Sequence, residues 1–302
     1  MIPLEKVRAA AARAAPYVLA TPVLPAPDGT ALKLDLLQPT GSFKVRGYFA
    51  AALALSEDER RKGLLTVSAG NAAAACAYVA NRLGVRCRVV MFETAPAPKL
   101  DAVRRWGGEP VLMPREQLFR WMAERAWESE PEAFIHPHSD VEVAAGHGGV
   151  GLELLDEVPE LRRVVVPVGG GGLVTGVAAA VKPAGVEVIG VQSDGYPLWP
   201  RSIEVGKQAE VTPNTIADGT AAPFNPFMFE RLKDAVDRWI VVPEPRLKAA
   251  IAELLSIAKV VPEGAGALAY AALEQLQPGP ATAALVTGGN IDTELLGELI
   301  RP

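Results

Sequence analysis

Short apolar segments alternate with longer helix-forming segments along almost the whole of this chain. The apolar segments are mostly bounded by Gly, Pro or charged residues, and the segments between them are rich in Ala and Leu, which favour helices. This alternation predicts an α/β fold in which parallel sheets are covered on both faces by helices. We expect strands at Leu64–Val67, Cys87–Phe92, Pro110–Met113, Ala133–His136, Val164–Val168, Val186–Val191 and Ala283–Thr287.

The size and charge of the chain limit its partners. With 302 residues, 49% of them hydrophobic, it is long enough for two packed lobes. The net charge of −5 leaves no basic surface for nucleic acid. The Ala-rich N-terminus is interrupted by charged residues such as Glu5 and Arg8, so it predicts a surface helix ending near Pro16, not a signal peptide or membrane span. We expect no nucleic-acid or membrane partner and a cytoplasmic location.

The two cysteines give no sign of a disulfide framework. Cys76 falls in an expected helix and Cys87 in an expected strand. Both are therefore predicted to be small buried residues that stay reduced.

Lys44 lies between a turn and an Ala-rich helical segment, in the run 39–47 (PTGSFKVRG). An amine at the start of a helix faces the positive end of the helix dipole, which disfavours the protonated form. A neutral amine is what Schiff-base chemistry requires. A lone lysine is usually only a solvated surface residue, and two glycine-containing loops further along the chain favour the chemical role here.

The first loop, Ser68-Ala69-Gly70-Asn71, separates an expected strand from an expected helix that ends at Gly84. The free N–H groups at such a helix start can hold a carboxylate, although Ser68 or Asn71 could instead be an ordinary helix cap. The second loop, Gly169–Gly172, also joins a strand to a helix, which begins at Leu173. Four consecutive glycines carry a large entropic cost and are not expected to serve packing. They fit a loop whose amides surround a phosphate.

A lysine, a carboxylate loop and a phosphate loop together indicate pyridoxal 5′-phosphate (PLP). The sequence resembles the fold-type II PLP-dependent enzymes, specifically the threonine/serine dehydratase and serine racemase group. The resemblance rests on segments that occur in the family's order and span nearly the whole chain. They are LKLDLLQPTGSFKVRG (32–47), SAGN (68–71), GGGGL (169–173) and TGGN (287–290), with weaker matches at FIHP (134–137), TIADG (215–219) and EGAGA (263–267).

The resemblance implies a two-lobed fold like that of the tryptophan synthase β chain, with PLP in the cleft between the lobes. The large, PLP-binding lobe would comprise residues 1–55 plus 138–302, and the small inserted lobe residues 56–137. The resemblance also implies an assembly of two or four copies, a homodimer or homotetramer.

The resemblance assigns roles to particular residues of this chain. Lys44 would hold the cofactor and act as the catalytic base, and Thr287 would face the pyridine nitrogen. The remaining cofactor-binding residues would be Phe43, Asn71 beside the ring hydroxyl, Gly169, Gly170, Gly171, Gly172 and Leu173 at the phosphate, and Glu263 at the outer edge of the ring. The substrate would be bound by Ser68, Ala69, Gly70, Asn71 and His138.

The implied function is β-elimination from L-threonine or L-serine, giving a 2-oxo acid and ammonia. Two related alternatives are a serine racemase and a dehydratase of another β-hydroxy amino acid, such as 3-hydroxyaspartate. An alternative of another class is a PLP-binding homologue without lyase activity. Racemisation needs a second acid–base group, which in serine racemases is implied to be the second Ser of a Ser-Ser-Gly-Asn loop. Ala69 occupies that position here and cannot transfer a proton.

Several residues depart from the family's pattern. Ala72 and His138 stand where other residues are usual, and Gly-His-Gly-Gly replaces Gly-Gln-Gly-Thr at 146–149. These changes could be neutral substitutions in loops. Alternatively, His138 enters the substrate pocket and favours a more polar or acidic side chain than that of threonine. His136 and His138 share a strand face without a third ligand, and Gln192 stands where cation-dependent relatives carry Glu, so no metal site is expected.

Overall fold

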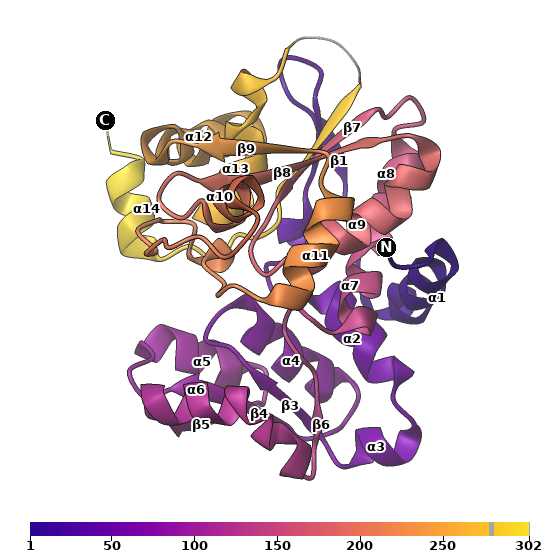
Figure 1. Ribbon diagram of the computed structural model, residues 1–302, viewed down its shortest axis with the longest axis vertical. Coiled ribbons are helices and arrows are strands. Elements are labelled where there is room, and N and C mark those ends of the chain that lie inside the picture. Colours follow the sequence, from indigo (N-terminus) through magenta and orange to yellow (C-terminus); the bar gives the residue numbers. More distant parts are fainter. Residues whose placement is uncertain (278–280, 302) are drawn as a thin grey trace.

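The computed structural model describes residues 1–277 and 281–301, and its strands form two separate sheets. We call the part around the larger sheet the large lobe and the part around the smaller sheet the small lobe (Figure 1). The large-lobe sheet has the order β1 (Val23–Pro25), β2 (Ala31–Lys33), β10 (Thr282–Leu285), β7 (Arg163–Pro167), β8 (Glu187–Ser193) and β9 (Arg238–Val242). The small-lobe sheet has the order β5 (Glu109–Met113), β4 (Cys87–Phe92), β3 (Leu64–Val67) and β6 (Ala133–Phe134).

Neighbouring strands of both sheets are parallel, with one exception. The edge strand β1 pairs antiparallel with β2, so the expectation of parallel sheets needs this correction. All seven expected strands occur, and three strands were not predicted. The strands β1 and β2 are three residues long, too short to show a pattern, and β9 starts with the charged residue Arg238.

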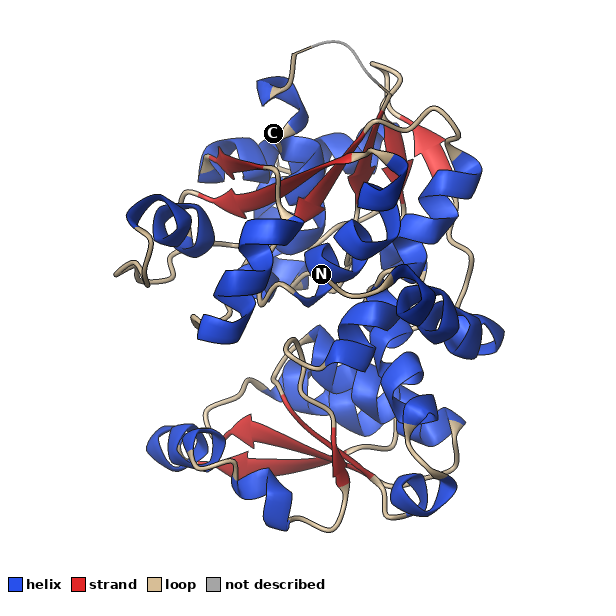
Figure 2. Ribbon diagram, turned by 45° about the vertical axis from the view of Figure 1, so that its right-hand side comes forward, coloured by secondary structure: helices blue, strands red, loops and turns tan. Residues whose placement is uncertain are grey.

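Helices cover both faces of each sheet (Figure 2), which confirms the α/β fold class. The large lobe contains α8 (Gly149–Glu157), α9 (Gly172–Val181), α10 (Leu198–Val205), α11 (Pro226–Ala235), α12 (Glu244–Ile257), α13 (Gly264–Ala271) and α14 (Thr293–Leu299). The small lobe contains α3 (Glu57–Arg61), α4 (Asn71–Arg82), α5 (Ala97–Arg105) and α6 (Arg115–Ala123). Near the junction of the lobes lie α1 (Leu4–Ala14), α2 (Lys44–Ala54) and α7 (Val141–His147). Short 3₁₀ helices are η1 (Ala15–Tyr17), η2 (Asp35–Leu37), η3 (Ala126–Ser129), η4 (Lys182–Ala184), η5 (Asp218–Thr220) and η6 (Leu273–Gln275).

The core is built from the two faces of each sheet. Along β7, Val164 and Val166 pack into one hydrophobic cluster and Val165 packs into another, because successive side chains of a strand point to opposite faces. Each of these side chains is fully buried, which stabilises the fold by about 1.5–3 kcal/mol per residue. The cluster that contains Val164 continues through α2 and α7 to Leu64 in the small lobe, so the two lobes share a core.

Glycines allow α2, α7 and α9 to pack very closely. A Cβ atom added at Gly146 would lie 2.4 Å from that of Ala50 on α2, and one at Gly176 would lie 1.9 Å from the carbonyl oxygen of Ala144. These contacts hold α2 at the junction of the two sheets. The expected boundaries, 1–55 plus 138–302 and 56–137, stay predictions because α2 packs on both lobes; residues 278–280 and 302 lie outside the described residues.

The prediction for the two cysteines is confirmed. Cys76 and Cys87 are buried free thiols whose sulfur atoms lie 3.6 Å apart. Within residues 1–277 and 281–301, none of the helices is both long and apolar enough to cross a membrane.

Candidate active site

Lys44 is the first residue of α2, and the loop before it is tied to the loop after β10. The N–H of Phe43 donates to the carbonyl oxygen of Thr287 at 3.0 Å, and the N–H of Gly289 donates to that of Gly41 at 2.9 Å. Gly41 has a φ of +73°, and a Cβ there would lie 2.7 Å from Oδ1 of Asn290. These backbone contacts bring Lys44 close to Thr287, which is far from it in sequence.

The amine of Lys44 is less basic than that of an exposed lysine. Burial lowers its pKa to about 8, and the nearby carboxylate of Glu263 partly opposes this effect. Lys44 does begin a helix, as expected, but burial is the main physical cause of the lowered pKa, because removing an ammonium ion from water is unfavourable. Its Nζ lies 4.9 Å from the ring centre of Phe43.

Asn71 and Glu263 meet beside this lysine, although they come from different lobes. Nδ2 of Asn71 donates to Oε1 of Glu263 at 2.7 Å, and Oδ1 of Asn71 accepts from Nδ2 of Asn290 at 2.7 Å. Burial and the neighbouring Asp218 raise the pKa of Glu263 to about 7, against the opposing effects of Asn71 and Lys44. Sequence reasoning missed Asn290 as a site residue, although it ends the matching TGGN segment.

The Ser68–Asn71 loop leaves the start of α4 open. The residue that precedes this helix is Gly70, which has no side chain to cap it. The hydroxyl oxygen of Ser68 instead accepts from the N–H of Gly70 at 3.1 Å. The alternative that Ser68 or Asn71 caps the helix is therefore wrong, and the first amides of α4 remain available for an anion. Ala69 is half-buried in this loop.

The glycine loop lies at the start of α9, and its glycines do serve packing, contrary to expectation. A Cβ at Gly169 would lie 2.9 Å from the carbonyl oxygen of Gly219, and one at Gly171 would lie 2.8 Å from Cε of Met228. Only Gly171 among the four has a positive φ, +91°. Because no side chain caps α9, its first amides are also free to bind an anion. Leu173 lies in the first turn of α9, with 6% of its surface exposed.

Thr287 is buried at the end of β10, close to α13. Its hydroxyl contacts the carbonyl oxygen of Ala265 at 3.4 Å, a distance at which a hydrogen bond is weak. The hydroxyl is therefore free to change partner when a ligand is present.

His138 lies against the glycine loop. A Cβ added at Gly170 would lie 2.4 Å from Cγ of His138. Burial, His136 and the charge of Lys44 lower the pKa of His138 to about 3, so its imidazole is neutral at physiological pH. A neutral imidazole does not attract a carboxylate as a cation would, which removes the electrostatic reason to expect an acidic substrate side chain.

His147 is buried, and it belongs to the helix α7 and not to a loop of variable sequence. Its ring meets that of Phe43 edge-on at 4.7 Å, and a Cβ at Gly47 would lie 2.4 Å from its Cε1. Neither ring nitrogen has a hydrogen-bond partner within the described ranges. Burial and two nearby cations, Lys44 and Arg46, hold its pKa well below the usual value.

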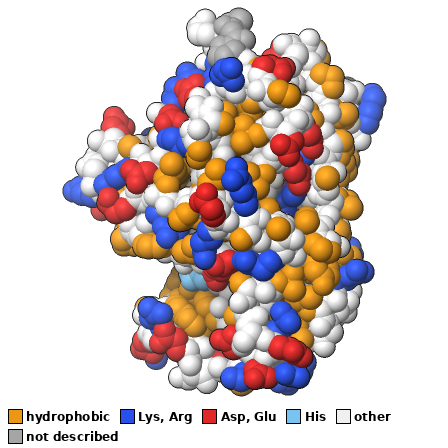
Figure 3. All heavy atoms as spheres, turned by 90° about the vertical axis from the view of Figure 1, so that its right-hand side faces the viewer, with side chains coloured by type: hydrophobic (Ala, Val, Ile, Leu, Met, Phe, Trp, Pro, Cys, Tyr) orange, Lys and Arg blue, Asp and Glu red, His pale blue; other side chains and the backbone are white. Residues whose placement is uncertain are grey.

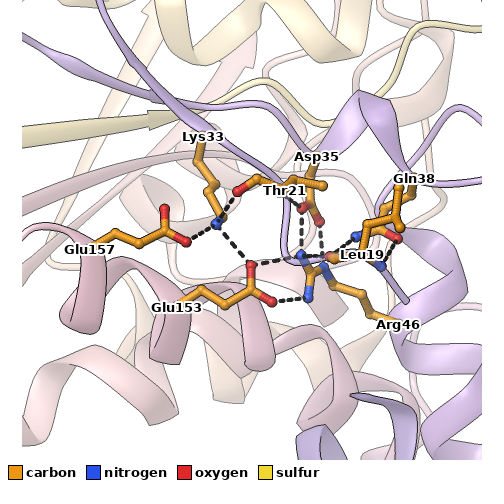
Figure 4. Close-up of polar contacts among 8 residues, drawn as sticks. All are labelled: Leu19, Thr21, Lys33, Asp35, Gln38, Arg46, Glu153 and Glu157. Carbon is orange, nitrogen blue, oxygen red and sulfur yellow. Dashed lines mark hydrogen bonds and ion pairs between the residues drawn. The ribbon is translucent and has the colours of Figure 1, made fainter. Parts of the chain in front are cut away.

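Arg46 anchors the other side of α2 through a buried network of charges (Figure 4). Its guanidinium donates to both carboxylate oxygens of Asp35 at 2.8 Å and to both of Glu153 at 2.6 and 2.9 Å. Glu153 also pairs with the buried amine of Lys33 at 2.8 Å. Sequence reasoning did not single out Arg46. Its place in the same run as Lys44 was the signal that could have found it.

The surface is hollowed between the two lobes, and a histidine side chain is visible there (Figure 3). A cavity of about 500 Å³ borders this region, and its lining includes Trp127 and His136 together with Asn225 of the large lobe. None of the predicted site residues lines this cavity, so it is separate from the Lys44 site. The two regions meet where the rings of His136 and His138 touch at 4.6 Å.

Comparison with known proteins identifies the family. Residues 14–288 match the family model described as pyridoxal-phosphate dependent enzyme. The chain belongs to this family. This membership confirms the fold-type II resemblance and identifies PLP as the cofactor.

Three relatives from this family illustrate the similarity. The chain is 40% identical over 278 residues to an L-threonine ammonia-lyase of Thermotoga maritima, covering 89% of this chain and 69% of that protein. It is 38% identical over 273 residues to a phenylserine dehydratase of Ralstonia pickettii, covering 87% of this chain and 84% of that protein. The structure of maize serine racemase matches with a TM-score of 0.91 at 32% identity, covering 98% of this chain and 96% of that one.

The residues at the site fit PLP chemically. Lys44 supplies an amine whose pKa, lowered to about 8, makes the neutral form accessible near physiological pH, and α9 supplies an uncapped helix start for a phosphate. The glycine loop gives backbone amides close access, because it has no side chains in the way. Asn71 and Thr287 add groups that can donate hydrogen bonds near Lys44.

Proposed function

We propose that this PLP-dependent ammonia-lyase eliminates the β-hydroxyl group of L-threonine or L-serine, producing a 2-oxo acid and ammonia. One observation carries the proposal. The amine of Lys44, whose pKa is lowered to about 8, lies near two uncapped helix starts, one in each lobe. Each helix start offers amides to an anion. The names of the relatives, L-threonine ammonia-lyase among them, support the same substrate class.

Lys44 is proposed to hold the cofactor and then to take the proton from Cα of the substrate. Bound PLP supplies an electron-withdrawing group that makes this proton acidic. Lys44 suits the role of base because burial lowers its pKa to about 8, close to physiological pH. After the β-hydroxyl has left, the released enamine tautomerises and hydrolyses to the 2-oxo acid and ammonia without another group of the enzyme.

The start of α4 is proposed to bind the carboxylate of the substrate. Gly70 leaves the first amides of this helix uncapped, and the positive end of the helix dipole favours an anion there. Asn71 follows directly, and its contacts with Glu263 and Asn290 join the small lobe to the large lobe. Substrate binding at α4 would therefore bring the carboxylate close to Lys44.

The glycine loop Gly169–Gly172, with Leu173, is proposed to hold the cofactor phosphate, and Phe43, Thr287 and Glu263 the ring. A Gly170→Asp variant tests this placement, because a carboxylate there would repel the phosphate and occupy its space. We expect no PLP binding in this variant. Unchanged PLP affinity would mean that the phosphate binds elsewhere.

A racemase is the main alternative function, since serine racemases are among the similar proteins. It is disfavoured because Ala69 has no proton to transfer, and Ser68 Oγ is held within the loop, where it accepts from the N–H of Gly70. Chiral analysis of L-serine after partial turnover tests the alternative. Substantial D-serine from the wild type would establish racemisation, whereas D-serine from Ala69→Ser alone would support the proposal.

Release of 2-oxo acid from a panel of β-hydroxy amino acids tests the proposed activity. The panel contains L-threonine, L-serine, L-threo-phenylserine and 3-hydroxyaspartate. We expect turnover of the first two. Preference for 3-hydroxyaspartate would favour the other dehydratase, and PLP binding without any 2-oxo acid release would identify a homologue without lyase activity.

The assembly and location belong to the same proposal. We propose a homodimer or homotetramer in the cytoplasm, with a small amino acid as the binding partner. The free thiols Cys76 and Cys87, whose sulfur atoms lie within 3.6 Å, suit a reducing compartment. Light scattering during size-exclusion chromatography measures the number of copies directly, and a monomer would contradict the proposal.

A further inference from the structure

His136 fixes the turn that connects β6 to α7. Its Nδ1 accepts from the N–H of Ser139 at 3.2 Å and from the N–H of His138 at 3.4 Å. Nδ1 therefore carries no proton, which places the proton of the neutral ring on Nε2. The ring meets those of Phe134 and Trp127 edge-on at 5.9 and 6.5 Å. His136 is thus held on both sides, and it holds the backbone of His138.

This turn places His138 directly against the glycine loop. Its Cγ would lie 2.4 Å from a Cβ at Gly170, and its carbonyl oxygen 3.1 Å from a Cβ at Gly172. The imidazole occupies the space that a side chain at Gly170 would need. A larger residue at Gly170 would displace His138 as well as obstruct the loop.

The ring nitrogens of His138 have no hydrogen-bond partner in the part of the chain that the structure describes. The ring is half-buried, and its one close neighbour with a ring, His136, meets it edge-on without a hydrogen bond. An imidazole with no protein partner beside the anion-binding glycine loop has its N–H available to a bound anion.

We propose that His138 donates a ring N–H to the cofactor phosphate and so completes the phosphate site formed by the backbone of Gly169–Gly172. This inference rests on the proposed placement of the phosphate. It differs from the sequence-based expectation that His138 contacts the side chain of the substrate. His136 acts through His138 as a positioning residue, because it fixes the backbone and not the ligand.

The charges in the site are consistent with this role. The neutral imidazole has one N–H to donate. A phosphate dianion then attracts the donated proton, which strengthens the hydrogen bond.

Two variants of His138 separate the donor from the ring. His138→Phe keeps the aromatic shape but removes both nitrogens, whereas His138→Gln keeps an N–H donor. The apoenzyme of each is titrated with PLP and with pyridoxal, which lacks the phosphate. We expect Phe to weaken PLP binding roughly tenfold and to leave pyridoxal binding unchanged, because a hydrogen bond to a charged group is lost. Gln should recover most of the PLP affinity.

Phosphorus NMR of bound PLP supplies a second readout that does not depend on turnover. The phosphate resonance should move in His138→Phe and return towards the wild-type position in His138→Gln. Equal weakening of PLP and pyridoxal in His138→Phe, or unchanged PLP binding with a changed KM for the substrate, would overturn the inference.

The Gly170→Asp variant distinguishes failure of this inference from failure of the proposed function. Loss of PLP binding in Gly170→Asp, together with no effect of His138→Phe, would reject only the role of His138. Normal PLP binding in both variants would reject the phosphate site itself. Ser139→Ala serves as the matched control, because it lies next to His138 and its backbone N–H, not its side chain, binds His136.

Discussion

The two faces of α2 carry charged residues whose surroundings differ completely. Arg46 is enclosed by carboxylates, and both Asp35 and Glu153 bind its guanidinium in bidentate fashion. Lys44, two residues earlier, has no ion-pair partner in the described chain, and burial lowers its pKa to about 8. Burial thus produces two outcomes on one helix. Where the charge is paired it is retained, and where it is unpaired the neutral form becomes accessible.

The pKa values record this difference. Burial by itself would lower the pKa of Arg46 and raise that of Asp35, but their mutual attraction and hydrogen bonds reverse both shifts. At Lys44, the effect of burial exceeds the opposing effect of Glu263. The paired charges suit a structural role, and the unpaired amine suits chemistry. Three predictions test this contrast, and a fourth tests the expectation that no metal ion is needed.

The largest effect is expected from Lys44→Ala. Turnover should fall by about 1,000-fold or more, because the same amine holds the cofactor and removes the proton. The melting temperature of the apoprotein should not fall, since a buried unpaired amine does not stabilise the fold. Covalently attached PLP in this variant, seen by mass spectrometry after borohydride reduction, would refute the assignment.

Arg46→Met should instead lower the stability of the fold. It leaves the carboxylates of Asp35 and Glu153 without their partner, so the free energy of unfolding should drop by about 3–5 kcal/mol. Chemical denaturation measures this change. Arg61→Met is the matched control, because Arg61 forms an ion pair with Asp58 on the exposed helix α3 and should change stability by less than about 0.5 kcal/mol. Similar losses in both variants would show that the buried network is not special.

The third prediction concerns the pH at which Lys44 becomes reactive. Its pKa is lowered, so the neutral amine dominates above pH of about 8 and not only above the value of 10.5 for an ordinary lysine. The rate at which apoenzyme attaches PLP should therefore rise through pH 8 and then level off. Glu263→Gln should move the midpoint to lower pH, because Glu263 raises the pKa of Lys44. A midpoint near that of free lysine would contradict the prediction.

The smallest effect is expected from removing metal ions. Gln192 stands where cation-dependent relatives carry a metal ligand, but both its amide nitrogen and its amide oxygen already form hydrogen bonds within the protein. Nε2 donates to the carbonyl oxygen of Val168 and Oε1 accepts from the N–H of Trp199, at 2.9 and 2.8 Å. A neutral amide in this position is a poor ligand for Mg²⁺ or Ca²⁺. Activity after treatment with EDTA should equal that before it, and a strict need for added Mg²⁺ would show an ion site elsewhere.

The sequence was most informative where the signal is local. Leu64–Val67 and Cys87–Phe92 form strands with the predicted bounds, because runs of 4 and 6 mainly apolar residues are too short for a typical helix and suit a buried strand. It was least informative for β1 and β2, which are three residues long each and join the sheet through the pairing of β2 with β10, far along the chain. Asn290 and Arg46 were missed as site residues because their roles depend on partners that are distant in sequence.

The sequence by itself determined the fold class, the cofactor family and the residues from which a site could be built. Motifs such as 39–47 and Gly169–Gly172 carry this information, because a turn, a helix start and a chemical group are encoded within a few residues. The tertiary structure alone decided how those residues behave. It buried Lys44 and left it unpaired, gave Arg46 its carboxylates, and placed a neutral His138 on the glycine loop. Burial and electrostatic pairing depend on every element packed around a group, and no local pattern of residues records them.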